Sequence, residues 1–148
     1  TSESFSIFKQ MADGTLKPGA PDLAFGLVDV RDVAEAHVRA AFTPEAKGRY
    51  ITSGHDSSLM GIASILRESF GNDWPFPKRT LPKSLLWLVG PLANKALTRK
   101  FISRNVGYPA SFDNTKSKKE LGMSYRPLPE TVDEMFQQML DAGSIRKP

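Results

Sequence analysis

The chain has 148 residues, of which 40% are apolar and 24% charged, and its 20 basic and 16 acidic side chains give a formal charge of +4. One ordinary domain has this length, and it buries roughly two thirds of the surface that the unfolded chain exposes. The absence of cysteine excludes disulfides, thiolate catalysis and iron–sulfur clusters, and two histidines leave no His-rich metal site. Only a magnesium site made of carboxylates stays open.

Basic residues occur along the whole chain and alternate with acidic ones, although the isoelectric point is near 9.4. We interpret the lysine run 116–119 as a solvated helix face and expect no nucleic-acid partner. No secretory signal begins the chain, and the longest uncharged stretch, 84–94, is far short of the ~20 residues of a membrane span. We therefore expect a cytoplasmic protein without a membrane partner and without a metal.

The first predicted elements are a short helix and a strand. Phe5, Phe8 and Ala12 share one helical face, and Gly14 follows as a left-handed stop. The compact apolar run 23–28 comes after a turn-rich stretch, which favours a buried strand.

A longer helix over 30–41 follows, with Asp29 or Asp32 as its cap. Its apolar face consists of Val30, Val33, Ala34, His37, Val38 and Ala41. We expect this face to be buried, which makes His37 a core or pocket-edge histidine rather than a catalytic one.

Residues 48–54 have glycines at both ends and β-forming residues between them, which predicts a second strand. His55 is then a loop residue, and 56–58 supply the cap of a third helix. The buried positions of that helix are Leu59, Ile62, Ala63, Leu66 and Phe70, and Gly71 stops it.

The second half of the chain is predicted to be mostly helical. Three prolines make 73–82 an extended loop, and 85–97 forms two helical pieces that bend at Gly90-Pro91. A brief extended segment at 112–114 leads into a short helix over 115–121, and an amphipathic helix begins near Leu128 and ends at Gly143. The pattern predicts an α/β protein, mostly helical with a few short strands.

Residues that could carry chemistry have simpler structural explanations. Ser53, His55 and Asp56 are too close in sequence to converge on one reacting atom. The acidic groups Asp29 with Asp32, and 130–134, fit helix capping and dipole complementarity better than a metal site. The aromatic residues beside the proline-rich loops either stack on a ligand or pack in the core, and they are Trp74, Phe76, Trp87 and Tyr108.

Several segments together are similar to a known family. They are 27–37, 44–51, 53–56, 112–116, 121–122 and 126–128. Their order and spacing resemble the C-terminal portion of extended short-chain dehydrogenases/reductases in the NAD-dependent epimerase/dehydratase superfamily, and most closely the dihydroflavonol 4-reductase and cinnamoyl-CoA reductase branch. The resemblance covers nearly the whole chain.

The resemblance implies a Rossmann-type fold whose glycine-rich cofactor loop and Tyr-x-x-x-Lys pair are absent from this sequence. We expect 1–148 to be a single unit that combines the last elements of the cofactor domain with the substrate-binding subdomain, without the N-terminal Rossmann core. NADP or NAD would serve the parent protein, and we expect neither to bind this chain alone. No residue of this chain is assigned a catalytic or cofactor-binding role.

By the same resemblance, the substrate pocket is flanked by Ser2, Phe25, Gly26, Leu27 and Trp87. The run 49–51 and the pair Asp113 and Lys116 are expected to be architectural.

Two functional hypotheses stay open. In the first, the chain is the substrate side of a carbonyl reductase whose partners are a small carbonyl substrate and the missing Rossmann portion. In the second, it is a stand-alone α/β binding or interaction module without catalysis. If the Rossmann portion is missing, an uncovered apolar surface around Phe25, Leu27 and Val28 predicts self-association.

Overall fold

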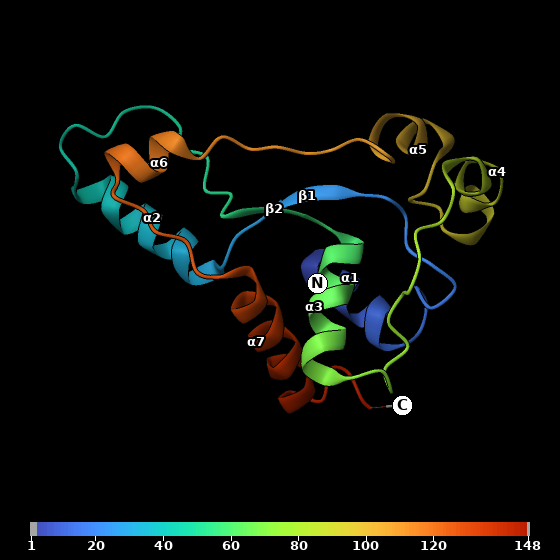
Figure 1. Cartoon of the computed structure of the whole chain (residues 1–148). Helices are drawn as coiled ribbons and strands as arrows, with labels where there is room; N and C mark the ends of the chain where they lie inside the picture. Colours follow the sequence, from blue (N-terminus) through green and yellow to red (C-terminus); the bar gives the residue numbers. More distant parts are fainter. Residues whose placement is uncertain (1–2, 148) are drawn as a thin grey trace. The chain divides into compact units, whose positions relative to one another are not determined.

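The computed structural model describes residues 3–147, except for the side chain of Ala93, and contains seven helices and two strands in that range (Figure 1). In chain order they are α1 (Glu3–Ala12), β1 (Ala24–Leu27), α2 (Val30–Phe42), β2 (His55–Ser58), α3 (Leu59–Phe70), α4 (Lys83–Ala93), α5 (Arg99–Asn105), α6 (Thr115–Glu120) and α7 (Leu128–Asp141). The predicted α/β class, mostly helical with a few short strands, is confirmed. Ser2, a predicted substrate contact, lies outside the described residues.

The described residues form two compact units. The first unit contains residues 3–24, 58–109 and 132–147, and the second contains residues 25–57 and 110–131. The boundaries between the units therefore run through β1, β2 and α7. The assignment of 1–148 to parts of a cofactor domain and a substrate subdomain stays a prediction.

Phe136 of α7 is the centre of the core of the first unit. Its ring is fully buried, and its centroid lies 4.6 Å from that of Phe70 on α3 and 5.0 Å from that of Trp74. Phe76 at 5.5 Å and Phe8 of α1 at 6.5 Å complete the cluster. Tilted aromatic pairs at these separations add to the free energy of burial. Trp74 and Phe76 are therefore core residues.

Four of the predicted helices are confirmed together with their ends. Ser58 caps α3, because its Oγ accepts a hydrogen bond from the Gly61 amide at 3.1 Å. Gly71 after α3 and Gly143 after α7 have φ values of 83° and 65°, a left-handed conformation that a side chain would strain. The helices α1 and α6 likewise fall where the pattern indicates, and the proline-rich stretch 73–82 is an extended loop.

The helix α2 begins and ends as predicted, but the face predicted to be buried is exposed. Val30 is 77% exposed and Val38 57%, whereas the buried residues of the helix are Asp32 and Ala36. The reason is that α2 packs through the small side chain of Ala36 against the segment that follows α6. The predicted apolar face therefore lies on the side of α2 that faces away from the core of the second unit.

His37 shares this open face and is not a core residue. Its ring is exposed, and Nδ1 lies 2.7 Å from the carbonyl oxygen of Val33, one turn earlier in the same helix. The interpretation of His37 as a core residue is therefore wrong, and its interpretation as a pocket-edge residue stays a prediction.

The second strand lies at 55–58 and not at 48–54, and it includes His55, which was predicted to be in a loop. β2 pairs with β1 in a two-stranded sheet, whereas 48–54 forms no strand and contacts β1 through a main-chain hydrogen bond from the Gly54 amide. Side chains take the carbonyl groups of this segment instead. Lys116 Nζ donates to the Arg49 oxygen at 3.4 Å, and Asn114 Nδ2 donates to the Ser53 oxygen at 2.6 Å.

The apolar stretch from residue 85 forms one helix, α4, rather than two pieces bent at Gly90-Pro91. Pro91 lies in the last turn, where its missing amide removes a single hydrogen bond near the helix end. Gly90 has no Cβ to clash with the proline ring. The chain then makes a turn and forms the short helix α5, which the sequence pattern did not predict.

We predict that Phe136→Ala lowers the free energy of unfolding by about 3–5 kcal/mol, because it empties a fully buried aromatic site. Urea denaturation followed by circular dichroism measures this difference. The matched control is Phe42→Ala on α2, where the ring is 83% exposed and the change should be within about 0.5 kcal/mol. Equal losses for the two variants would contradict this account of the core.

Candidate functional site

The strand β1 carries three of the predicted substrate contacts. Phe25, Gly26 and Leu27 are half-buried neighbours on this strand, and the Leu27 oxygen accepts a hydrogen bond from the Gly54 amide at 2.8 Å. Trp87 lies on α4 of the first unit and is 44% exposed. The structure thus brings three predicted residues together in the second unit and places the fourth in the other unit. Their role in substrate binding stays a prediction.

Gly26 is required by a close approach between β1 and two neighbouring segments. A Cβ atom built on Gly26 would lie 2.4 Å from Ser53 Oγ and 2.9 Å from Cδ2 of Phe112. The Ser53 hydroxyl is buried and has no hydrogen-bond partner among the described residues. A buried hydroxyl without a partner is costly, so Ser53 is a candidate for contact with a bound polar group beside β1.

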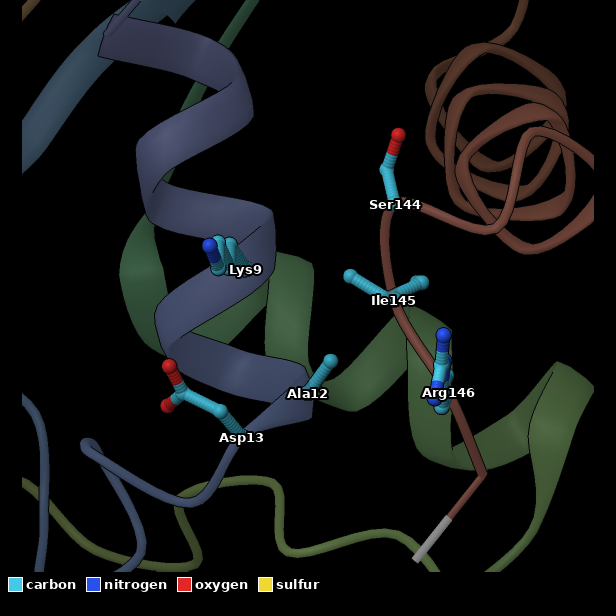
Figure 2. A pocket seen from close by; sticks show the side chains of 6 residues that line it. All are labelled: Lys9, Ala12, Asp13, Ser144, Ile145 and Arg146. Carbon is cyan, nitrogen blue, oxygen red and sulfur yellow. The ribbon is translucent and has the colours of Figure 1, made fainter.

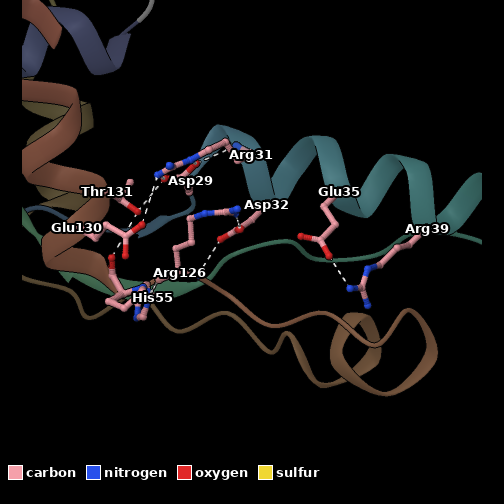
Figure 3. Close-up of polar contacts among 10 residues, drawn as sticks. Asp29, Arg31, Asp32, Glu35, Arg39, His55, Arg126, Glu130 and Thr131 are labelled. Atoms are coloured by element: carbon pink, nitrogen blue, oxygen red, sulfur yellow. Dashed lines mark hydrogen bonds and ion pairs between the residues drawn. The ribbon is translucent and has the colours of Figure 1, made fainter.

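Asp29 connects the end of β1 to the start of α2 (Figure 3). Its Oδ1 accepts from the amide and from Nε of Arg31, both at 2.8 Å, and Oδ2 accepts from Arg31 Nη2 at 2.7 Å. The Thr131 hydroxyl donates to Oδ2 at 3.1 Å. These contacts, first of all the hydrogen bonds from the Arg31 side chain, hold the pKa of Asp29 well below its usual range. Asp29 is the predicted cap of the helix.

Asp32, one turn further along α2, is almost fully buried and forms an ion pair with Arg126 (Figure 3). Its Oδ2 also accepts from the Arg126 amide at 2.9 Å, so one carboxylate binds both the main chain and the side chain of this residue. The Arg126 oxygen lies 2.7 Å from Nε2 of His55 on β2. Asp32 and 126–128 both stand out in the sequence, but no local pattern pairs residues 94 positions apart.

The residue types of a hydrolase triad do not form one here. The His55 ring is engaged with the Arg126 oxygen, and Asp56 accepts from the Phe112 amide at 3.3 Å. No group of three or more metal-ligating side chains gathers within residues 3–147. The acids at the start of α7 also have structural contacts, since Asp133 accepts from the Ser69 hydroxyl at 2.6 Å. These polar residues thus hold segments of the chain in position.

The residues expected to be architectural make contacts that join segments of the second unit. Lys116 Nζ donates to the Lys47 oxygen at 2.6 Å and lies 4.3 Å from the centre of the Tyr50 ring. The Tyr50 hydroxyl donates to Glu120 at 2.8 Å, and desolvation together with this carboxylate raises the pKa of Tyr50. Asp113 accepts from the Thr115 amide at 2.9 Å, and hydrogen bonding with Thr115 lowers its pKa.

A shallow groove lies in the first unit between the end of α1 and the segment that follows α7 (Figure 2). Its volume is about 230 Å³, below the usual size of a site for a drug-sized ligand. It is lined by Lys9, Ala12, Asp13, Ser144, Ile145 and Arg146. None of the predicted substrate contacts lines it.

The openings of α2 and α3 do not fit the pyrophosphate of a dinucleotide cofactor. A pyrophosphate binds where glycine-rich backbone opens a helix and free amides point at the phosphates. The sequence has no such loop, and the amides that open α2 and α3 already bind Asp29 and Ser58. The carboxylate of Asp29 would also repel a phosphate.

The chain is similar in sequence to known reductases. The chain is 36% identical over 121 residues to the NADPH-dependent methylglyoxal reductase GRE2 of Saccharomyces cerevisiae, covering 81% of this chain and 30% of that protein. It is 29% identical over 129 residues to cinnamoyl-CoA reductase 1 of Oryza sativa, covering 87% and 32%. No protein-family model matches the chain.

A solved structure agrees with these relatives. The crystal structure of the yeast methylglyoxal/isovaleraldehyde reductase Gre2 complexed with NADPH superposes with a TM-score of 0.65 at 29% identity, over 95% of this chain and 36% of that one. The chain belongs to the extended short-chain dehydrogenases/reductases. The resemblance to the C-terminal portion of its cinnamoyl-CoA reductase branch is confirmed, and the chain spans about a third of the length of the relatives it matches.

In this member of the extended short-chain dehydrogenases/reductases, we predict that Asp32→Asn lowers the free energy of unfolding by about 2–4 kcal/mol. The substitution leaves Arg126 without its charged partner in a largely buried contact. The matched control is Glu35→Gln, which removes the exposed pair between Glu35 and Arg39 on the same helix and should cost at most about 1 kcal/mol (Figure 3). Urea denaturation measures both. A smaller loss for Asp32→Asn than for Glu35→Gln would show that the buried pair is not structural.

We also predict a pH dependence for Asp29. Its pKa is lower in the folded state than in the unfolded state, so its charge stabilises the fold above about pH 4 and this contribution decreases as the pH falls further. At pH 7, Asp29→Asn should lower the free energy of unfolding by about 1 kcal/mol, because hydrogen bonds from Arg31 to a charged acceptor are stronger than those to a neutral amide. The difference between the two proteins should shrink steadily below about pH 4. A difference that stays constant from neutral to acid pH would refute the charged cap.

Proposed function

We propose that this chain forms the substrate side of an NADPH-dependent reductase that reduces an aldehyde or ketone to an alcohol. The observation that carries the proposal is the 36% identity to a methylglyoxal reductase over 121 residues. NADPH would supply the hydride, and a cofactor-binding portion that this chain does not contain would hold it. The particular carbonyl substrate, a dihydroflavonol-like ketone included, and the cytoplasmic location stay predictions.

In this function, β1 positions a wall of the substrate pocket. The apolar side chains of Phe25 and Leu27 would exclude water from the carbonyl group, and Gly26 lets Ser53 and Phe112 pack directly against the backbone of the strand. The Ser53 hydroxyl, which is buried without a partner beside Gly26, would orient a polar group of the substrate. Asp29 and Asp32 fix the strand end and the helix that follows, and they act as positioning residues.

The exposed face of α2 is the proposed docking surface for the cofactor-binding portion. Val30, Val38 and Phe42 lie on one side of the helix and are each more than half exposed. An apolar stripe of this kind on a surface helix normally packs against another element. Because the chain spans about a third of its relatives' length, the remaining portion of such a reductase is the natural partner.

We predict that the chain alone does not oxidise NADPH in the presence of methylglyoxal. NADPH should be oxidised when the chain is co-expressed with the N-terminal portion of the yeast relative, which ends where the matched segment begins. Absorbance of NADPH measures the rate, and co-purification measures the complex. Phe42→Asp should abolish both, because it places a charge in the apolar docking surface.

The matched control is Phe5→Asp on α1, where another half-exposed ring is replaced on a different helix and activity should be retained. Activity of the chain alone would contradict the proposed division of roles. A stable complex without activity would refute the reductase, and a compact chain that forms no complex would favour the stand-alone interaction module.

A further inference from the structure

The helix α4 is apolar on all sides, and only one side is covered. Leu86 packs with Ile102 and Val106, which are fully buried, and Gly90 lies close to Ile102. On the other side, Leu88 is 60% exposed and Leu92 89% exposed. This open face also includes Leu85, Trp87 and Val89. An exposed apolar patch of this kind marks an interaction site in a folded protein.

The surroundings of this face are strongly basic. Residues 74–112 contain seven lysines and arginines and no aspartate or glutamate. Four of the seven follow α4 directly and are exposed, and they are Lys95, Arg99, Lys100 and Arg104. None of these four forms an ion pair with the described part of the chain. Asp22 contacts the region through its main chain, because its oxygen accepts from the Gly107 amide at 2.8 Å.

Two cation–π contacts place positive charge at the edge of the apolar face. The Arg99 guanidinium lies 4.6 Å from the centre of the Trp87 ring, and Lys83 Nζ lies 4.3 Å from that of Tyr108. α4 and α5 pack side by side (Figure 1), so the charges of α5 stay next to the apolar residues of α4. The result is an apolar centre with a cationic border.

We propose that this α4–α5 face binds the surface of an anionic phospholipid bilayer. Leu88, Leu92 and their neighbours would enter the boundary between headgroups and acyl chains, and the lysines and arginines would contact lipid phosphates and carboxylates. No helix within residues 3–147 is long and apolar enough to cross a membrane, so the contact is with the bilayer surface. This proposal departs from the expectation that the chain has no membrane partner.

The charge pattern distinguishes a lipid surface from a second copy of this chain. Two α4–α5 faces in contact would bring their basic borders together, and residues 74–112 offer no acid to neutralise them. An anionic bilayer supplies both the apolar layer and the negative charge. This proposal does not rest on the reductase function, and the variants below leave Trp87, the predicted substrate contact, unchanged.

Co-sedimentation with vesicles tests the proposal. The chain should bind vesicles of phosphatidylcholine mixed with phosphatidylserine, and binding should weaken as salt is added. Leu88→Ser combined with Leu92→Ser should lower the partition coefficient about tenfold or more. The control is Val38→Ser combined with Phe42→Ser, which removes two exposed apolar side chains of α2 and should not change binding.

Arg99→Glu combined with Lys100→Glu should lower the partition coefficient about 25-fold or more, at about fivefold for each basic residue that is lost and with added repulsion from the two new acids. The control is Lys118→Glu combined with Lys119→Glu on α6, which changes the net charge equally and should have a much smaller effect. Circular dichroism confirms that each variant is folded.

Three results would overturn the proposal. They are no binding to the anionic vesicles, equal binding to vesicles of phosphatidylcholine alone, and binding that the α2 or α6 controls reduce as much as the α4–α5 variants do. The chain could instead self-associate without binding vesicles, and the α4 substitutions could abolish this self-association. That result would assign the α4–α5 face to a second copy of the chain and would also overturn the proposal.

Discussion

Asp32 and Arg126 lie 94 positions apart in the sequence, and their ion pair joins the two chain segments from which the second unit is built. A carboxylate this deeply buried requires a charged partner, because an unpaired charge away from water costs far more free energy than the surrounding packing can offset. The bond from the Arg126 amide adds a main-chain constraint to the ionic one. The end of β1, the start of α2 and the chain before α7 are therefore held in one arrangement.

This arrangement gives the polar side chains around it structural roles. Asp29 contacts Arg31 and Thr131, and the ring of His55 contacts a main-chain oxygen. Each of these groups holds a segment of the chain in position. What the network holds in place is the short strand β1, with a close approach at Gly26 and a buried hydroxyl at Ser53. In the proposed reductase, such a scaffold would shape the substrate pocket.

The helices α2 and α4 each expose several apolar side chains, and the charges around the two faces differ. On α2, the basic residues Arg31 and Arg39 are neutralised by acids of their own unit, which leaves the stripe around Phe42 suited to an ordinary protein contact. Around α4, the basic residues have no acid in the surrounding sequence, and the apolar face is bordered by positive charge. The exposed apolar faces of α2 and α4 thus indicate different partners, because the balance of charge around each face differs.

Local signals in the sequence determined the ends of five helices and the buried positions of α3 and α7, and the order of its segments indicated the family. Caps such as Asp29 and Ser58, stops such as Gly71, and the spacing of α3 and α7 act through neighbours a few residues away, so they can be read without the fold. Only the tertiary structure decided which side of α2 is buried, which segment pairs with β1, and that Asp32 binds Arg126. Those outcomes depend on residues that are distant in the sequence. An apolar pattern shows that a helix face packs against a partner, but it does not show whether that partner belongs to the same chain.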